Sequence, residues 1–254
     1  MTETLPLTGE RTAPGIWHEN YWFARHEAAY RWLIGLRADG QPVARGRVLD
    51  AGCGEGYGAE LLRTSGAEAV VGLDYDSTTL RHVAKAYPQL KVLQGNLVQQ
   101  GLADRSFDLV VSLQTIEHLW DQPRFVAECA RVVRPGGTVV LSTPNRLTFP
   151  AGNWYHTREL SAPELVDLAA AELEVCLLAS LRHGPRLTAW EAQHGSCVEA
   201  QLATDPADWA GSLAALIRSV AVADFTIAAA SADEAADSLD LLVVCRPTDE
   251  PEVG

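Results

Sequence analysis

Basic residues are scarce in this sequence of 254 residues. It holds 20 lysines and arginines, of which only Lys85 and Lys91 are lysines, against 33 aspartates and glutamates, so its formal net charge is -13. A nucleic-acid-binding protein needs a basic face to displace counterions, and an anionic membrane surface attracts the same kind of face. The composition therefore argues against a nucleic-acid partner and against a membrane partner. Residues 205–254 alone carry ten acidic and two basic side chains, or -8 of the total.

Long apolar runs and paired cysteines are also missing. The most apolar long window, 212–230, is interrupted by Arg218 and Asp224, so it does not predict a membrane span. Residues 1–10 lack a basic stretch followed by an apolar one, and we therefore expect no secretory signal. The five cysteines are odd in number and form no Cys-x-x-Cys pair. This pattern predicts a cytoplasmic protein, kept reduced, without a cysteine-ligated metal.

Short apolar segments alternate with helical ones from residue 47 onward. We predict strands at 47–50, 69–74, 91–94, 107–113 and 138–142, and helices at 57–64, 77–86 and 124–133. Continuous apolar strands separated by helices indicate a parallel sheet that is covered on both faces. Pro135-Gly136-Gly137 predicts the turn into the fifth strand. A helix after Ser161 and two more strands, 174–180 and 239–245, give seven strands in all.

A glycine-rich loop follows the first strand, in the segment Val48-Leu49-Asp50-Ala51-Gly52-Cys53-Gly54-Glu55-Gly56-Tyr57-Gly58. Such a loop either packs strand against helix or lets the backbone approach a ligand closely. Gly54-x-Gly56-x-x-Ala59, with Asp74 twenty residues after Gly54, satisfies the dinucleotide fingerprint of an NAD-dependent oxidoreductase. Asp50 argues the other way, because a carboxylate repels a pyrophosphate and suits a ligand with an amino group. S-adenosyl-L-methionine, which has an ammonium, a sulfonium and no phosphate, fits that charge better.

This loop resembles the glycine signature of class I S-adenosylmethionine-dependent methyltransferases, and the similarity continues over about residues 47–145. It includes Gly72-Leu73-Asp74-Tyr75-Asp76, Gln94-Gly95-Asn96-Leu97, residues 107–112, Gln114-Thr115-Ile116-Glu117-His118-Leu119 and Arg134-Pro135-Gly136-Gly137. The resemblance implies an α/β fold, a three-layer Rossmann-like sandwich whose seven-stranded, mostly parallel sheet has an antiparallel last strand. It also implies an N-terminal arm and helical cap over 1–44, and a methyltransferase domain over 45–254 with an acceptor-binding insert at about 182–223.

The resemblance also implies a set of contacts to S-adenosyl-L-methionine. Gly52, Gly54 and Gly56 would line its methionine part, and Asp50 would lie near its ammonium group. Asp74 would accept hydrogen bonds from both ribose hydroxyls. The remaining expected contacts are Tyr75 against the adenine ring, Asn96 at the adenine amine, its neighbour Leu97, and Gln114 facing the methyl-transfer position.

The candidate catalytic residues are His118, its neighbour Glu117, and His156. Methyl transfer is an in-line displacement at a carbon that the sulfonium already activates, so the protein mainly positions the acceptor and removes its proton. Histidine, which titrates near ~6.5 when unperturbed, is the natural base. His118 follows the fourth strand, at the edge where open α/β sheets bind ligands, and its alternative role is to hold the following loop. His156 lies in an aromatic-His-x-Arg-Glu segment similar to one in sugar and lipid methyltransferases, and its alternative role is to cap the next helix.

Two further features follow from the resemblance. Some O-methyltransferases of this class bind Mg²⁺ through Glu-x-x-Glu-His, but here Gln114 takes the place of the first glutamate. Losing a carboxylate weakens a site for a hard cation, so Mg²⁺ is not favoured and no metal ligand is assigned. The arm Gly9-Glu10-Arg11 resembles one in a bacterial subgroup, in which Arg11 would reach the methionine carboxylate. The alternative is that Trp17 and Trp22, which follow the arm, only pack their helix on the domain.

The whole pattern resembles actinobacterial methyltransferases associated with methylglucose lipopolysaccharide synthesis. That resemblance implies O-methylation of a small-molecule or glycan hydroxyl, such as a glucosyl hydroxyl. Two rival hypotheses are an NAD-dependent oxidoreductase and a non-catalytic protein that binds S-adenosylmethionine. The pattern leaves the oligomeric state open.

Overall fold

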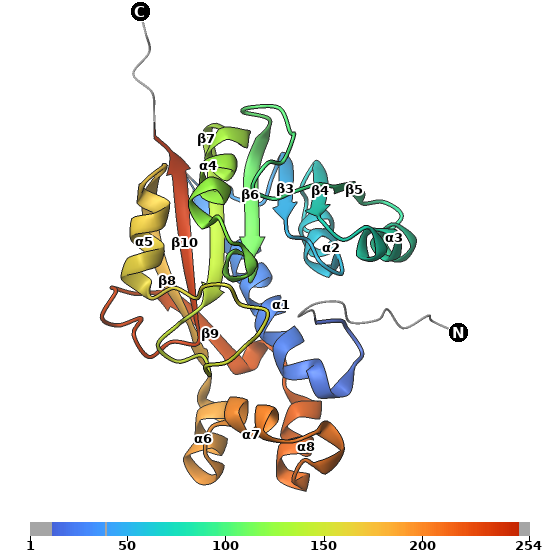
Figure 1. The fold of residues 1–254 in the computed structure, drawn as a ribbon, viewed down its shortest axis with the longest axis vertical. Helices are drawn as coiled ribbons and strands as arrows, with labels where there is room; N and C mark the ends of the chain where they lie inside the picture. Colours follow the sequence, from blue (N-terminus) through green and yellow to red (C-terminus); the bar gives the residue numbers. More distant parts are fainter. Residues whose placement is uncertain (1–11, 39, 249–254) are drawn as a thin grey trace, which may run out of the picture.

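An eight-stranded sheet, in the order β5-β4-β3-β6-β7-β10-β8-β9, forms the centre of the computed structural model, which describes residues 12–38 and 40–248 (Figure 1). Its strands are Arg47–Ala51 (β3), Ala69–Asp74 (β4), Lys91–Gln94 (β5), Phe107–Leu113 (β6), Val133–Pro144 (β7), Leu173–His183 (β8), Phe225–Ala229 (β9) and Asp240–Pro247 (β10). A separate small hairpin pairs Arg37–Ala38 (β1) with Gln41–Pro42 (β2). The α-helices are Asn20–Gly35 (α1), Tyr57–Thr64 (α2), Ser77–Ala86 (α3), Gln122–Val132 (α4), Ala162–Ala170 (α5), Pro185–His194 (α6), Cys197–Ala203 (α7) and Gly211–Ser219 (α8). Short 3₁₀ turns cover Trp17–Glu19, Ile116–His118, Pro206–Asp208 and Val222–Asp224.

The pairing of the strands confirms the predicted fold class. β5, β4, β3, β6 and β7 pair in parallel, whereas β10 pairs antiparallel with both β7 and β8. The sheet has one strand more than the predicted seven, because β9 adds antiparallel to β8 at the edge. Only Phe225 of β9 is buried. Its sequence, Phe-Thr-Ile-Ala-Ala, is largely apolar, yet the sequence-based prediction did not include it.

The turn predicted at Pro135-Gly136-Gly137 is wrong. These residues lie inside β7, where the pairing with β6 shifts register between Phe107 and Leu109. Gly136 adopts a φ of 72° there. Glycine allows that left-handed conformation, so the segment bends the strand as a bulge instead of ending the helix before it.

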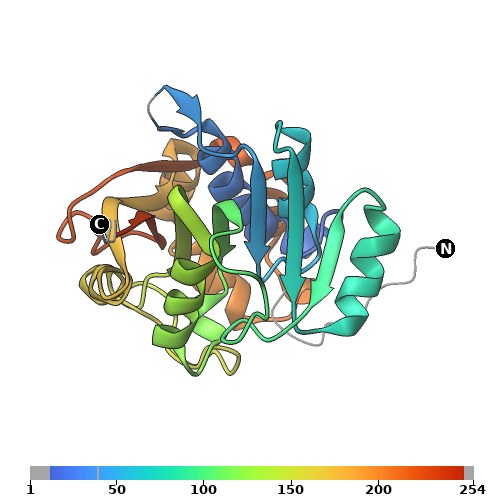
Figure 2. The same ribbon diagram turned by 90° about the horizontal axis from the view of Figure 1, so that it is seen from above.

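Alternate strand residues contribute to two apolar cores, one on each face of the sheet. Val48 and Val111 belong to the core that also includes residues of α1, α2, α3 and α8. Leu49 and Val110 belong to the core that includes residues of α4 and α5. Figure 2 shows the strands as a twisted central layer with helices on either side. The predicted three-layer arrangement is therefore confirmed.

Helices α6 to α8 leave the sheet between β8 and β9 and gather at one end of the molecule (Figure 1). Helix α8 packs on the start of α1 and on the 3₁₀ turn before it, where the Trp17 ring meets Trp209 edge to face at 5.6 Å. The guanidinium of Arg218 lies 3.7 Å from the centre of the Trp17 ring, and the Asn20 side chain donates to the Ile217 carbonyl at 2.8 Å. Trp17 thus packs its helix on the rest of the protein. Among the helices of the described residues, none is both long and apolar enough to cross a membrane.

Candidate active site

The glycine loop bends back over the end of β4. Gly52, Gly54 and Gly56 all have positive φ, at 88°, 48° and 78°. The Gly52 amide donates to the Leu73 carbonyl at 2.8 Å, and a Cβ on Gly52 would overlap the Thr115 side chain. A Cβ on Gly54 would instead project into open space. The loop therefore presents bare backbone to its surroundings, as close approach to a ligand requires.

A cavity of about 530 Å³ opens beside this loop, and we call it the glycine-loop cavity. Its lining consists of Thr12, His26, Tyr30, Gly52, Cys53, Gly54, Glu55, Tyr57, Asp74, Tyr75, Leu97, Leu113, Gln114, Thr115, His118, Leu119, Trp120 and Tyr155. The predicted cofactor residues among them are Gly52, Gly54, Asp74, Tyr75, Leu97 and Gln114. The cavity lies at the carboxyl ends of the parallel strands, where open α/β sheets bind ligands.

The Asp74 carboxylate is held in place by two backbone amides. The N–H of Gly54 donates to its Oδ2 and the N–H of Asp76 to its Oδ1, each at 3.0 Å. Asp74 itself is buried at the cavity wall, next to Tyr75. A carboxylate oxygen accepts more than one hydrogen bond, so Asp74 retains capacity for a pair of hydroxyls. This geometry fits the ribose of an adenosine cofactor.

Asp50 lies behind the cavity wall, not in it. It is fully buried, and the Tyr30 hydroxyl donates to its two carboxylate oxygens, at 3.1 and 3.2 Å. Burial raises the pKa of Asp50 to about 7, and the hydrogen bond from Tyr30 opposes that rise. Tyr30, unlike Asp50, lines the glycine-loop cavity. Sequence reasoning did not assign Tyr30 to the site.

Other predicted cofactor residues also lie away from the cavity lining. Gly56 precedes α2, and a Cβ on it would overlap Val83. Asn96 is exposed, and its Oδ1 already accepts the Val98 amide at 3.1 Å. Arg11 falls outside the described residues. Direct contact of these residues with a cofactor therefore stays a prediction.

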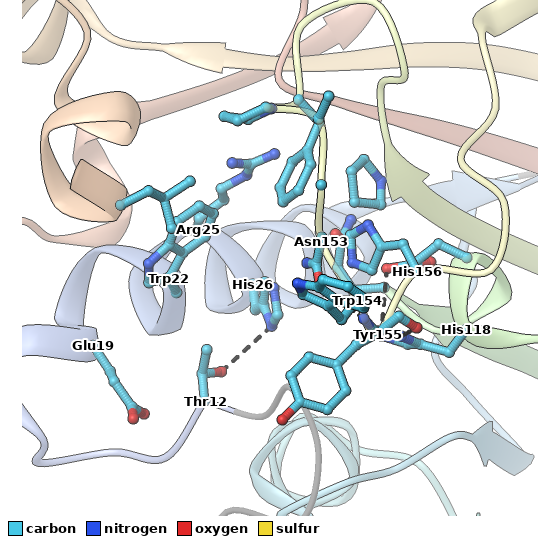
Figure 3. A pocket seen from close by; sticks show the side chains of 18 residues that line it. Thr12, Glu19, Trp22, Arg25, His26, His118, Asn153, Trp154, Tyr155 and His156 are labelled. Atoms are coloured by element: carbon cyan, nitrogen blue, oxygen red, sulfur yellow. Dashed lines mark hydrogen bonds and ion pairs between the residues drawn. The ribbon is translucent and has the colours of Figure 1, made fainter. Parts of the chain in front are cut away.

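A second cavity, of about 580 Å³, adjoins the first, and we call it the aromatic cavity (Figure 3). Its lining consists of Thr12, Glu19, Trp22, Arg25, His26, Gln114, Glu117, His118, Pro144, Phe149, Pro150, Ala151, Gly152, Asn153, Trp154, Tyr155, His156 and Leu202. Five residues line both cavities: Thr12, His26, Gln114, His118 and Tyr155. A ligand in one cavity can therefore meet a ligand in the other at this shared wall.

The predicted catalytic residues come together at the aromatic cavity. The rings of His118 and His156 meet edge to face with centroids 5.0 Å apart. Nδ1 of His118 lies 2.9 Å from the Tyr155 carbonyl, and Nδ1 of His156 lies 2.7 Å from Oε1 of Glu159. Both partners accept hydrogen bonds, so each Nδ1 carries the proton and the neutral ring has its lone pair on Nε2. His118 Nε2 lies 3.9 Å from Oε1 of the buried Glu117.

Within the described part of the chain, two clusters bring possible metal ligands within 4.8 Å of one another. Glu117, His118 and His156 form the first. This cluster offers one carboxylate and two imidazoles, a set that suits Mn²⁺, Fe²⁺ or Zn²⁺ better than Mg²⁺, which prefers oxygen ligands. The second cluster is His183, Glu191 and Cys197, and it lies outside both cavities.

His26 is the histidine that the sequence-based assignment omitted from the site. It lines both cavities, and its Nδ1 lies 3.3 Å from the Tyr57 hydroxyl and 3.4 Å from the Thr12 hydroxyl. Trp22, His26 and Tyr30 are spaced four residues apart on α1. Side chains at that spacing share one face of a helix, so this pattern was the available signal. Trp22 lines the aromatic cavity and does more than pack its helix.

The insert contributes less to the cavities than its length suggests. Of the described residues between 182 and 223, Leu202 is the one in the lining of the aromatic cavity. Arg186 instead pairs with Asp224, and His194 stacks on Trp190 with centroids 4.4 Å apart. The assignment of acceptor binding to this insert stays a prediction.

This chain is similar to known proteins both in sequence and in fold. A family model described as a methyltransferase domain matches residues 49–141. A probable S-adenosylmethionine-dependent methyltransferase of Mycolicibacterium smegmatis is 47% identical over 257 residues, covering 97% of this chain and 97% of the relative. A ubiquinone biosynthesis O-methyltransferase of Mesorhizobium japonicum is 36% identical over 133 residues, covering 49% of this chain and 51% of the relative. A solved methyltransferase of Thermotoga maritima, described as a possible histamine N-methyltransferase, has a TM-score of 0.61 at 17% identity, covering 91% of each chain.

The likeness to the Mycolicibacterium protein extends over nearly the whole of both chains, whereas the likeness to the Thermotoga structure shows the shared fold alone. The cavity beside the glycine loop, with Asp74 held at its wall, agrees with the cofactor that the relative's name states. The likeness to this relative, together with the methyltransferase family model, sets aside the NAD-dependent and the non-catalytic hypotheses. The chain belongs to the class I S-adenosylmethionine-dependent methyltransferases.

Proposed function

We propose that this enzyme methylates a hydroxyl oxygen of a small-molecule or glycan acceptor, with His118 as the base. One observation carries the proposal: His118 lines both cavities, and the Tyr155 carbonyl fixes its Nδ1 proton, so that Nε2 has the lone pair. A general base must lie within reach of the proton it removes. His118 meets this requirement for a hydroxyl placed at the shared wall.

S-adenosylmethionine supplies a methyl group already activated by the sulfonium. The chain's own residues then have three tasks. Asp74 and the bare backbone of Gly52 and Gly54 hold the cofactor in the glycine-loop cavity, with Asp50 as the source of negative charge for its ammonium group. The wall of the aromatic cavity orients the acceptor next to the cofactor, so that the bimolecular reaction becomes effectively unimolecular. His118 takes the hydroxyl proton.

Glu117 and His156 support this base. Glu117 is 1% exposed and lies beside Nε2 of His118, where a carboxylate stabilises the imidazolium that forms. Glu159 holds the His156 ring through its Nδ1, and that ring packs against His118. The pair of rings therefore presents a preorganised face to the acceptor.

The lining of the aromatic cavity favours a neutral polyol such as a sugar. Trp22, Phe149 and Trp154 offer ring faces for the apolar side of a sugar ring, and Asn153 offers hydrogen bonds. Arg25 is buried and donates to the Asp240 carboxylate at 2.7 Å, so its charge is balanced within the protein. The name of the Mesorhizobium relative, an O-methyltransferase, also supports transfer to oxygen. A glucosyl hydroxyl, as in methylated polysaccharides, fits these features.

A metal-assisted reaction is the second candidate, because Glu117, His118 and His156 bring three ligand atoms within 4.8 Å of one another. An ion held there would lower the pKa of a bound hydroxyl, so that no histidine base would be needed. The single carboxylate disfavours Mg²⁺, and we favour the histidine base over the other ions because the Tyr155 carbonyl already orients His118 as a base.

The proposal is tested by incubating the enzyme and S-adenosylmethionine with methyl glucosides, oligosaccharides, phenols and amines, and by measuring S-adenosylhomocysteine release. We expect release with one or more of the sugars, and a product heavier by one methylene group. His194→Gln is the matched control for His118→Gln, because His194 lies on α6 away from both cavities. Release with amines alone would contradict O-methylation.

A further inference from the structure

Tyr30 links a buried carboxylate to the glycine-loop cavity. The Tyr30 side chain is 5% exposed and lines the cavity, whereas Asp50 is 0% exposed and does not. The phenol O–H donates to both oxygens of Asp50, at 3.1 and 3.2 Å. Because its proton is committed to Asp50, the Tyr30 oxygen has only lone pairs left to offer to a ligand.

Three elements hold the Tyr30 ring in this position. It comes from α1, its hydroxyl binds the end of β3, and its ring meets that of Tyr57 on α2 with centroids 6.0 Å apart. Gly58, in the first turn of α2, makes room for it, because a Cβ on Gly58 would overlap the Tyr30 ring. The orientation of the phenol is therefore preorganised before any ligand binds.

Among the described residues, the groups that shift the pKa of Asp50 are Tyr30 and Asp74, and neither is a cation. Burial raises its pKa to about 7, and the negative charge of Asp74 on β4 adds to the rise, whereas the Tyr30 hydrogen bond opposes it. The negative charge of Asp50 also raises the pKa of Tyr57 on α2. A neutral phenol stabilises the carboxylate and leaves its negative charge in place, whereas an arginine would neutralise that charge. The negative potential of Asp50 thus remains available for a cation in the cavity.

We propose that Tyr30 binds the ammonium group of S-adenosylmethionine through its phenol oxygen, while Asp50 holds the phenol proton and supplies the charge. The inference rests on the proposed role of Asp50 in the cofactor site. It changes that role from direct contact to action through Tyr30. A hydrogen-bond chain of this kind strengthens each member, because donating the O–H to a carboxylate makes the phenol oxygen a better acceptor.

The test compares two ligands by calorimetry: S-adenosylhomocysteine, and 5′-methylthioadenosine, which lacks the ammonium and carboxylate groups. For Tyr30→Phe we expect the affinity for S-adenosylhomocysteine to fall about 10- to 100-fold, the usual effect of losing a hydrogen bond to a charged group. The affinity for 5′-methylthioadenosine should stay unchanged. Tyr87→Phe is the matched control, because Tyr87 lies outside both cavities.

The wild-type protein provides a second measurement that does not depend on the folding of a variant. Its affinity for S-adenosylhomocysteine should fall up to about tenfold from about pH 8 to about pH 6, as Asp50 gains a proton. The affinity for 5′-methylthioadenosine should not follow pH in this way. A pH-independent affinity for both ligands would overturn the inference.

Asp50→Asn separates this inference from the assignment on which it rests. Suppose that Asp50→Asn lowers the affinity for S-adenosylhomocysteine but not for 5′-methylthioadenosine, and that Tyr30→Phe lowers neither. Asp50 then acts directly, and the role proposed for Tyr30 is wrong. If neither variant affects binding, both the Tyr30 role and the Asp50 assignment are wrong. If Tyr30→Phe lowers the affinity for both ligands equally, Tyr30 has a purely structural role, and the inference is likewise overturned.

Discussion

The ring of His118 meets the ring of His156 edge to face, with centroids 5.0 Å apart. His118 follows β6 and His156 follows β7, two strands that are neighbours in the parallel part of the sheet. The carboxyl ends of parallel neighbours lie at one edge, so residues distant in sequence reach the same cavity wall. Both histidines therefore line the aromatic cavity, in which we propose that the acceptor binds.

Replacing the proposed base should slow the reaction without weakening the binding of the cofactor. We expect His118→Gln to lower kcat about 10²- to 10⁴-fold, the range that a general base contributes. The affinity for S-adenosylhomocysteine should change little, because we propose that Asp74 and the glycine loop hold the cofactor. Steady-state kinetics and calorimetry, with His194→Gln as the control, measure both quantities. An unchanged kcat would remove His118 from the mechanism.

Removal of divalent cations should leave the activity unchanged. The cluster of Glu117, His118 and His156 has one carboxylate, and Gln114 adds none, so the histidine route needs no ion. The measurement is the rate after dialysis against a chelator, together with elemental analysis of the purified protein. Loss of activity that Mn²⁺ or Mg²⁺ restores would assign these three residues to a metal and would contradict the histidine base.

Asp50 should make the free energy of unfolding depend on pH. Its pKa is about 7 in the folded protein and near the ordinary 3.8 once unfolded, so the folded state binds the proton more tightly. The resulting stabilisation is present below the unfolded pKa and is lost as the pH rises through about 7. Asp50→Asn should remove this loss, which amounts to up to about 4 kcal/mol.

Urea unfolding of both proteins across this pH range, without cofactor, provides the measurement. The difference in the free energy of unfolding between wild type and variant isolates the effect of Asp50. Other groups with shifted pKa values, such as Glu19 (raised) and Glu128 (lowered), are the same in both proteins. Parallel stability curves for the two proteins would contradict the prediction.

Trp154 should contribute to acceptor binding and not to folding. Its side chain is 97% exposed at the wall of the aromatic cavity. Trp154→Ala should therefore change the free energy of unfolding by less than about 0.5 kcal/mol, as exposed substitutions usually do. We expect it to raise KM for a glycan acceptor about fivefold, since an aromatic contact contributes about 1 kcal/mol.

Leu147→Ala is the comparison for Trp154→Ala. Leu147 is another exposed apolar residue, at 57%, but it lines neither cavity. Both variants should melt at the temperature of the wild type. An equal KM for wild type and Trp154→Ala would exclude Trp154 from the acceptor site.

Much of the sheet and the glycine loop could be predicted from the sequence. The segments 69–74, 91–94 and 107–113 coincide with β4, β5 and β6, because each has adjacent apolar residues at its centre. The position of Asp74 at the end of β4 follows from the same pattern. Strand β9, Phe-Thr-Ile-Ala-Ala, was not predicted although it is largely apolar, because a short apolar run does not by itself separate a strand from a helical segment, and β9 is defined by its pairing with β8.

Contacts between distant elements account for what the sequence did not reveal. Tyr30 and Asp50 are twenty residues apart, and their hydrogen bond depends on how α1 packs across the end of β3. Likewise, His26 reaches both cavities only because α1 runs beside them. The face shared by Trp22, His26 and Tyr30 is visible as a spacing of four, but nothing local shows what that face meets.

The most direct test of the central claim follows the methyl group itself. The enzyme is incubated with a glucoside acceptor and S-adenosylmethionine labelled with ¹³C in the methyl group, and the product is analysed by NMR. We predict that the label appears as a methyl ether on a sugar oxygen, and that His118→Gln forms this product far more slowly. Label on nitrogen, carbon or sulfur, or an equal rate for the variant, would contradict O-methylation with His118 as the base.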